Sequence, residues 1–181
     1  MLNADESKTE GDAYFWIAKA SIGLGRLAEA AENLEYYLLN FEGHRYHSEA
    51  NYQRRTLLFF HEDYQGAIQA FQQFLEEYPE SPFVANAYYW TGESLYELGR
   101  LEEAERLFRT VVREFPTSFR VEAARYRLSL IELKKREEEL LRLLQWSHES
   151  FLSAQEEFRR RQQVYEEALH QYQDRLAAGA S

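Results

Sequence analysis

Apolar residues along this chain fall into amphipathic stretches with helical spacing, which are arranged in pairs and joined by short turns. The pairs recur at a fixed step, since Ala30, Ala67 and Ala104 lie 37 residues apart. The same step separates three further sets: Phe41, Tyr78 and Phe115; Tyr52, Tyr89 and Tyr126; Ala50, Ala87 and Ala124. A fixed period of this size indicates one supersecondary unit stacked on copies of itself. The sequence therefore predicts an all-α solenoid of helical hairpins.

The period divides the first part of the chain into a polar segment, 1–11, which we expect to be flexible, and a repeat domain, 12–133. Within that domain we expect three repeats and a capping helix, at 12–47, 48–84, 85–121 and 122–133. Gly25 and Gly99 mark the turn inside the first and third repeats, because glycine relieves the chain at the end of a helix.

The C-terminal part of the chain lacks helix breakers, since no Gly or Pro occurs between Pro116 and Gly179. We expect a long amphipathic or coiled-coil helix at 134–178 and a short tail at 179–181. Five helix-pairing candidates recur every seven positions: Leu144, Phe151, Phe158, Tyr165 and Tyr172. Apolar residues three or four positions after these candidates support the pattern: Ala154, Ala168, Leu169 and Leu176. Arg161 and Arg175, also three positions after a candidate, weaken it. The serine-rich stretch Ser147–Ser153 could instead form a hairpin turn.

Composition narrows the possible partners. Among 181 residues, 45% are hydrophobic, which is too many for a disordered chain, and the formal net charge is −10. Nucleic acid and anionic membrane surfaces are therefore poor partners. The chain has no cysteine, which removes disulfides and thiolate chemistry. No apolar run reaches the length of a membrane span.

Candidate chemistry is sparse. His44, His47 and Glu49 lie close together in the sequence, but they fall in the loop between repeats and no fourth ligand is evident. We interpret this stretch as a solvated loop and expect no metal site. No phosphate-binding loop, nucleophile elbow or metalloprotease motif occurs. We therefore expect no cofactor and a protein that is not an enzyme.

The repeats resemble tetratricopeptide (TPR) repeats. In the third repeat the family positions are occupied by Tyr88, Gly92, Leu95, Ala104, Phe108, Val111 and Pro116. The second repeat departs from the family pattern in its first helix, where Asn51, Arg54 and Arg55 replace large, apolar and small residues. The resemblance implies a concave face lined by the first helix of each repeat.

A narrower resemblance covers roughly 48–133. The stretch that begins DYQGAIQAF at Asp63 is similar to the repeats of periplasmic CpoB (YbgF) and of the outer-membrane lipoprotein BamD. This resemblance implies a periplasmic or outer-membrane-associated protein, with a cytoplasmic location as the alternative. CpoB-like proteins carry their coiled coil before the repeats, whereas this chain has its long helix after them.

By analogy with the TPR family, the concave groove would be aromatic with few charges. Its expected lining is Phe15, Lys19, Ile22, Tyr52, Thr56, Phe59, Tyr89, Glu93, Tyr96 and Tyr126. Aromatic side chains give large contact areas, so we expect the groove to bind a peptide or helix of a partner protein. The alternative for each residue is simple packing against the neighbouring helix, or coverage by the C-terminal helix folded back into the groove.

The sequence therefore predicts a protein-interaction scaffold or adaptor in a bacterial cell-envelope complex. The alternative is a structural subunit whose homotypic assembly through the C-terminal helix is its function. A third possibility, a small apolar ligand in the concave face, would need a closed pocket.

Overall fold

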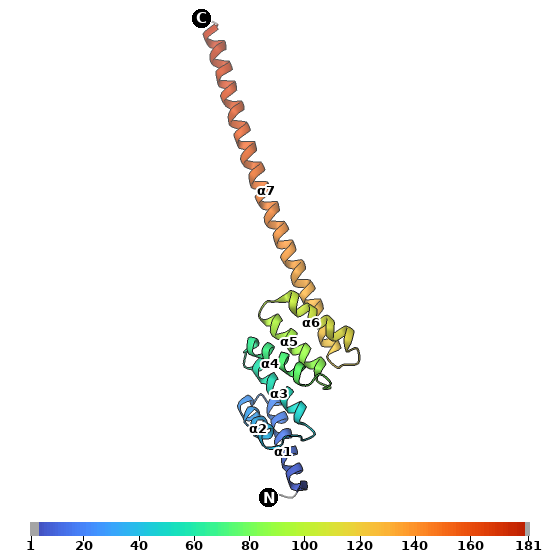
Figure 1. Ribbon diagram of the computed structural model, residues 1–181. Helices are drawn as coiled ribbons and strands as arrows, with labels where there is room; N and C mark the ends of the chain where they lie inside the picture. Colours follow the sequence, from blue (N-terminus) through green and yellow to red (C-terminus); the bar gives the residue numbers. More distant parts are fainter. Residues whose placement is uncertain (1–3, 180–181) are drawn as a thin grey trace. The chain divides into compact units, whose positions relative to one another are not determined.

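The computed structural model describes residues 4–179, and these contain seven α-helices and no β-strand (Figure 1). The helices are α1 (Ala4–Gly23), α2 (Leu27–Asn40), α3 (His47–Phe60), α4 (Tyr64–Glu77), α5 (Val84–Glu97), α6 (Leu101–Glu114) and α7 (Val121–Gly179). The chain divides into a repeat domain, Met1–Ile131, and a C-terminal segment, Glu132–Ser181. The all-α solenoid with a long final helix is confirmed.

Three helical hairpins build the repeat domain: α1 with α2, α3 with α4, and α5 with α6. Each hairpin turns through a residue with positive φ, namely Gly25, Glu62 and Gly99, again at a spacing of 37. The next N–H reaches back five residues each time, as in Arg100 N–H to the Leu95 carbonyl at 2.9 Å. The second repeat thus adopts the same turn as its neighbours, although it lacks glycine there.

Small residues set the distance between the helices of a hairpin. A Cβ added at Gly92 would lie 2.8 Å from Cε1 of Phe108, so only glycine allows α5 to approach α6 this closely. The equivalent residue of the second repeat is Arg55, whose side chain runs along α4 instead of entering the core. Its Nε–H donates to the Ala70 carbonyl at 2.8 Å, and its Nη2 pairs with Glu77 at 2.8 Å. Hydrogen bonds therefore replace close packing where the sequence departs from the family pattern.

The first helix begins earlier than the sequence predicts. Residues 4–11 were expected to be flexible but are part of α1, while residues 1–3 lie outside the described residues. Gly11 is buried, and a Cβ there would lie 3.1 Å from the Phe41 ring. Gly11 therefore packs against the residues that follow α2, inside a helix that extends beyond Asp12 toward the N-terminus.

Helix α7 contributes to both parts of the chain. Val121, Ala124 and Ile131 are buried, and the last two lie in the same core cluster as residues of α5 and α6. Beyond Glu132 almost every residue is exposed. The helix passes through Ser147–Ser153 without a turn, so the hairpin alternative is wrong, as expected for a stretch without Gly or Pro.

Candidate functional site

The expected aromatic ladder on the concave face is buried. Phe15, Tyr52 and Tyr89 lie in the core rather than on an open surface. In each repeat, a residue just before the next repeat covers the ring. Tyr46 stacks on Phe15 with centroids 4.3 Å apart, and Phe83 stacks on Tyr52 at 5.0 Å. For these three positions, the prediction of a partner-binding role is corrected to packing within the solenoid.

The third covering residue is an arginine. The Arg120 guanidinium lies 4.8 Å from the ring centroid of Tyr89, in the place that Tyr46 and Phe83 occupy in the earlier repeats. Tyr126 follows the same 37-residue step, but it is 64% exposed, because α7 continues where a further repeat would provide a covering residue. Of the four aromatic ladder positions, only Tyr126 is therefore available to a partner.

The polar positions of the expected groove are occupied by neighbours. Thr56 and Glu93 are buried, and the Thr56 hydroxyl donates to the Gln53 carbonyl at 2.6 Å. Lys19 forms an ion pair with Glu49 at 2.6 Å. The Lys19–Glu49 pair joins the first helices of successive repeats, and together these contacts leave little charge for a ligand.

Glu93 forms a two-point ion pair with Arg127 of α7. Its carboxylate accepts two hydrogen bonds from Arg127, at 2.7 Å from Nε and 2.5 Å from Nη2. These hydrogen bonds raise the pKa of Arg127 above its ordinary value, so the guanidinium stays charged. Burial raises the pKa of Tyr89, and the negative Glu93 adds to that shift. The arrangement fixes the charged guanidinium of Arg127 in place against Glu93.

The remaining expected groove residues are half-buried at the edges of the cores. Ile22, Phe59 and Tyr96 pack against three different core clusters, one in each repeat. Tyr96 also lies under the Arg127 guanidinium, with 4.6 Å to the ring centroid. Each of these side chains leaves only part of its surface open.

A different set of aromatic residues reaches the surface of the repeat domain. Trp90 contacts Phe59 and Phe60, with ring centroids 4.8 and 5.4 Å away, and its Nε1–H donates to the Tyr52 hydroxyl at 2.8 Å. Trp16 occupies the equivalent position two repeats earlier and is half exposed. We call the connected cluster around Trp90 the tryptophan face; its members are exposed or half-buried, and they are Phe60, Trp90, Phe119 and Arg120.

Arg120 connects this face to the core. Its guanidinium lies within 5.1 Å of the ring centroids of Trp90 and Phe119, and Nη2 lies 3.5 Å from the Tyr52 hydroxyl. Its Nε–H is buried and has no acceptor within the described chain. The surrounding aromatic rings therefore hold the guanidinium in place at the edge of the core.

Sequence reasoning missed the tryptophan face. The sequence did contain a sign of it, because Trp16 and Trp90 are separated by two 37-residue steps. The pattern was hard to recognise because the other positions in this series are Gln53 and Arg127. The covering positions 46, 83 and 120 also follow the period, but their residue types differ and so conceal the relationship.

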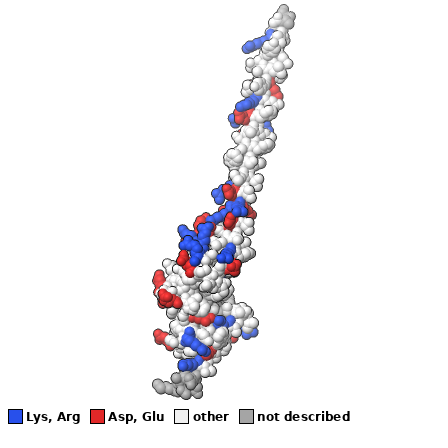
Figure 2. All heavy atoms as spheres, turned by 90° about the vertical axis from the view of Figure 1, so that its right-hand side faces the viewer, with Lys and Arg blue, Asp and Glu red and all other residues white. Residues whose placement is uncertain are grey.

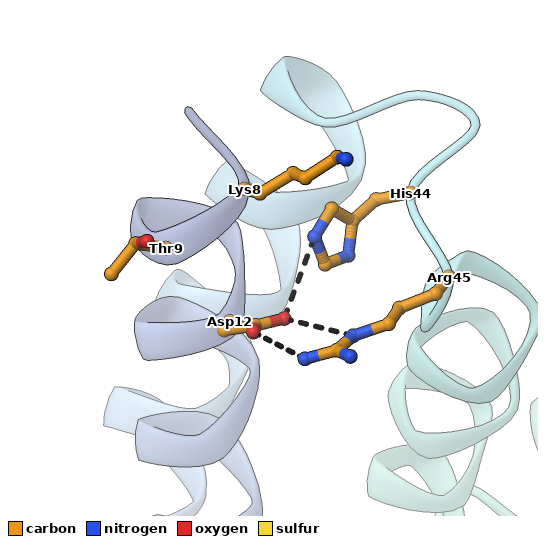
Figure 3. A pocket seen from close by; sticks show the side chains of 5 residues that line it. All are labelled: Lys8, Thr9, Asp12, His44 and Arg45. Carbon is orange, nitrogen blue, oxygen red and sulfur yellow. Dashed lines mark hydrogen bonds and ion pairs between the residues drawn. The ribbon is translucent and has the colours of Figure 1, made fainter. Parts of the chain in front are cut away.

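A polar pocket of about 520 Å³ lies at the other end of the repeat domain (Figure 3). Its lining residues come from α1 and the loop after α2: Lys8, Thr9, Asp12, His44 and Arg45. Asp12 accepts hydrogen bonds from Arg45, and its Oδ1 lies 3.5 Å from Nε2 of His44. On its other side, Nδ1 of His44 lies 2.7 Å from the Tyr37 hydroxyl.

These contacts correct the interpretation of His44 as part of a solvated loop. Burial raises the pKa of Tyr37 to about 12, so its hydroxyl keeps its proton. Glu49 pairs with Lys19 instead of the histidines. Within the described residues, no group of three or more His, Cys, Asp or Glu side chains is placed to hold a metal ion. The cluster ties α1 to the loop after α2.

The five expected helix-pairing residues all lie on α7 beyond Glu132. Leu144, Phe151, Phe158, Tyr165 and Tyr172 are 61–74% exposed and share one face of the helix through their seven-residue spacing. On the visible face of this C-terminal segment, charged side chains are crowded near its start and sparse over most of the rest (Figure 2). No helix in the described part of the chain combines the length and apolar character of a membrane span.

Comparison with known proteins identifies the repeat type. A tetratricopeptide repeat family model matches residues 52–119, from α3 to the loop before α7. The repeat domain has the tetratricopeptide fold. No curated protein sequence matches this chain.

Solved structures agree with this fold. The TPR domain of Arabidopsis OM64 aligns with a TM-score of 0.54 at 15% identity, covering 68% of this chain and 97% of that domain. The Hsp90 co-chaperone Cns1 from Saccharomyces cerevisiae gives 0.58 at 21% identity, covering 77% of this chain and 45% of that one. The second TPR domain of human RPAP3, in complex with an HSP70 peptide, gives 0.52 at 17% identity, covering 70% and 98%.

Proposed function

We propose that this protein is an interaction scaffold or adaptor whose TPR repeats bind a peptide or helix of a partner protein. The observation that carries this proposal is the tryptophan face, where aromatic rings at the surface surround the guanidinium of Arg120. Exposed aromatic side chains and arginine are the residues that contribute most to protein interfaces. The RPAP3 domain of the same fold, which is in complex with an HSP70 peptide, supports this class of function.

The partner segment is expected to be mainly apolar. The HSP70 peptide SGPTIEEVD in the RPAP3 complex contains three acidic residues. Here the basic side chains Lys19 and Arg127 already pair with Glu49 and Glu93, and the whole chain has a net charge of −10. Arg120 can therefore accommodate one carboxylate or carbonyl, while a strongly acidic segment would be repelled.

Cross-linking from defined positions tests the partner-binding role. A photo-reactive amino acid at Phe119, on the tryptophan face, should give one dominant adduct with a partner protein in the native host. The matched control is the same probe at Leu39, an exposed apolar residue of α2, which is not part of that face. The adduct at position 119 should disappear in the Arg120→Ala variant. Equal adducts from both positions, or none from position 119, would contradict the proposal.

We infer that the protein is not an enzyme. The titratable side chains that the fold gathers, such as Asp12 with His44 and Glu93 with Arg127, are engaged with one another. Such pairs favour a structural role. An enzyme would need a group held in reach of a substrate with a pKa suited to proton transfer.

We propose a place in a bacterial cell-envelope complex, in the periplasm or at the outer membrane. The support is the likeness of the stretch from Asp63 to the repeats of CpoB and BamD. The alternative is the cytoplasm. Fractionation of the host cells, with an antibody against the chain, distinguishes the two locations.

A second candidate function is homotypic assembly through α7. The exposed stripe beyond Glu132 favours it, because a soluble protein rarely leaves a long apolar face uncovered. The mass of the protein in solution tests this candidate independently of any partner of the repeats.

A further inference from the structure

The exposed stripe of α7 has a geometry that identifies its packing positions. A hollow of about 450 Å³ lies on this one helix, between Phe158, Gln162, Tyr165 and Leu169. The steps between these residues are four, three and four, as in the seam of a coiled coil. Arg161 and Glu166 flank the hollow. A hole that receives a side chain of a facing helix is formed by four residues of one helix. The hollow contains two such sets, namely Phe158, Arg161, Gln162 and Tyr165, and Gln162, Tyr165, Glu166 and Leu169.

The seam therefore consists of two sets of alternating positions. One set is the aromatic stripe that the sequence predicts. The other lies four residues further on: His148, Gln155, Gln162, Leu169 and Leu176. Arg161 belongs to the rim, because it is exposed and pairs along its own helix with Glu157 at 2.5 Å. Arg161 and Arg175, which lie three positions after the stripe residues Phe158 and Tyr172, are thus outside the seam.

We propose that a second copy of this chain covers the seam over residues 151–176, running antiparallel. In this register Phe151 faces Leu176 of the second copy, and Phe158 faces Leu169. Gln155 faces Tyr172, and Gln162 faces Tyr165, so that the Gln side-chain amide and the Tyr hydroxyl can form a hydrogen bond. The overlap is about 40 Å long at about 1.5 Å per residue.

Side-chain size favours the antiparallel orientation. Each layer then pairs one aromatic ring with a leucine or a glutamine, so that all layers have similar widths. A parallel pair in register would place Phe158 against Phe158 and Tyr165 against Tyr165, separated by layers of two glutamines. Parallel two-stranded coiled coils prefer leucine at these aromatic positions.

Charge favours the same register. Arg159 forms no ion pair within the described chain, and in the proposed pair it lies beside Glu166 of the second copy, twice by symmetry. A parallel pair would place Arg161 beside Glu166, but Arg161 already pairs with Glu157. Shifting the antiparallel pair by one heptad toward the N-terminus would bring Arg159 beside Arg159 and Arg161 beside Arg161. The proposed register is therefore the one that satisfies an unpaired charge without opposing like charges.

This inference rests on the second proposed function, homotypic assembly, and does not depend on the tryptophan face. The solution mass tests the assembly, and the chain orientation tests the inference, so that the two can fail separately. A monomer would overturn both and point to a helix of another protein. A dimer with another orientation would overturn only the inference.

Cysteine cross-linking measures the orientation, because the chain has no cysteine of its own. Phe158→Cys and Leu169→Cys are made separately in the full chain. Neither variant alone should form a disulfide-linked dimer under mild oxidation, whereas an equimolar mixture should link one variant to the other. A dimer that links each variant to itself shows parallel helices and overturns the proposal. A dimeric chain in which the mixture also fails to cross-link overturns the register.

Charge reversal tests the same register without altering the seam. Arg159→Glu places a second carboxylate beside Glu166 of the second copy, and we expect the dimer Kd to rise about tenfold. Adding Glu166→Arg to that variant should restore the Kd. Arg161→Glu is the matched control, since Arg161 has no charged neighbour across the proposed interface. A larger effect at Arg161 than at Arg159 would overturn the proposal and favour parallel helices.

Discussion

Glu93 of α5 and Arg127 of α7 form a buried, two-point ion pair that joins the last hairpin to the capping turns of the final helix. The residues lie 34 positions apart, and the Glu93 side chain is only 4% exposed. Because both charges have lost much of their contact with water, each depends on the other for its stability.

Removing one member of this pair is expected to be strongly destabilising. Glu93→Ala should lower the free energy of unfolding by about 3 kcal/mol, since it leaves Arg127 largely buried and unpaired. The double variant Glu93→Leu with Arg127→Met should lose much less than the sum of the Glu93→Leu and Arg127→Met single changes. Urea unfolding of the single and double variants measures this coupling. Additive losses would show that the pair contributes no interaction energy.

The turn of the second repeat holds a strained residue. Glu62 has φ of 62°, whereas the equivalent Gly25 and Gly99 are glycines with φ of 72° and 74°. Side chains other than glycine rarely adopt this conformation, so Glu62→Gly should raise the free energy of unfolding by about 0.5–1 kcal/mol. The matched control Gly99→Ala should lower it by a similar amount. Thermal unfolding of the two variants measures both changes. A Glu62→Gly variant that is less stable than the original protein would contradict the claim that the backbone at position 62 is strained.

The close approach of α5 and α6 predicts a second stability effect. Gly92→Ala would place a methyl group 2.8 Å from the ring of Phe108, a fully buried residue. The helices must move apart, at an expected cost of about 1–3 kcal/mol. A combined Gly92→Ala and Phe108→Leu variant should recover part of this loss, because the smaller side chain leaves room. Unfolding by urea tests both variants, and an unchanged midpoint for Gly92→Ala would contradict the packing.

Stability should fall in strongly alkaline solution through Tyr37. Its pKa is about 12 in the folded protein and about 10 in an unfolded chain. Because the folded state holds the proton more tightly, its contribution is complete below about pH 10 and is lost as the pH rises toward about 12. Tyr37→Phe should therefore show a shallower decline in unfolding free energy across this range. Parallel slopes for the two proteins would show that Tyr37 does not cause the decline.

The 37-residue step predicted the hairpins because the small residues at each helix crossing, such as Ala30, Ala67 and Ala104, are of one type and are fully buried. It did not predict what covers Phe15, Tyr52 and Tyr89. The covering residues are Tyr, Phe and Arg in turn. They lie at the end of the loop between two repeats, where the apolar spacing of the helices does not dictate the residue type.

Two further differences between the predicted and the observed helices concern α1 and α7, and both arise from local composition. The segment before Asp12 is polar, so the sequence shows no reason for a helix there, and the packing of Gly11 on Phe41 appears only in three dimensions. For α7, a straight helix and a hairpin would have shown the same periodicity. The continuous helix through Ser147–Ser153 resolves that alternative.

The mass of the full chain in solution, measured by light scattering, tests most directly whether the exposed helix is an assembly surface. A chain truncated after Leu144 keeps the repeat domain and serves as the comparison. We expect the full chain at twice its 21.6 kDa and the truncated chain as a monomer. A full chain that remains monomeric at high protein concentration would contradict homotypic assembly. A dimeric truncated chain would place the interface in the repeats.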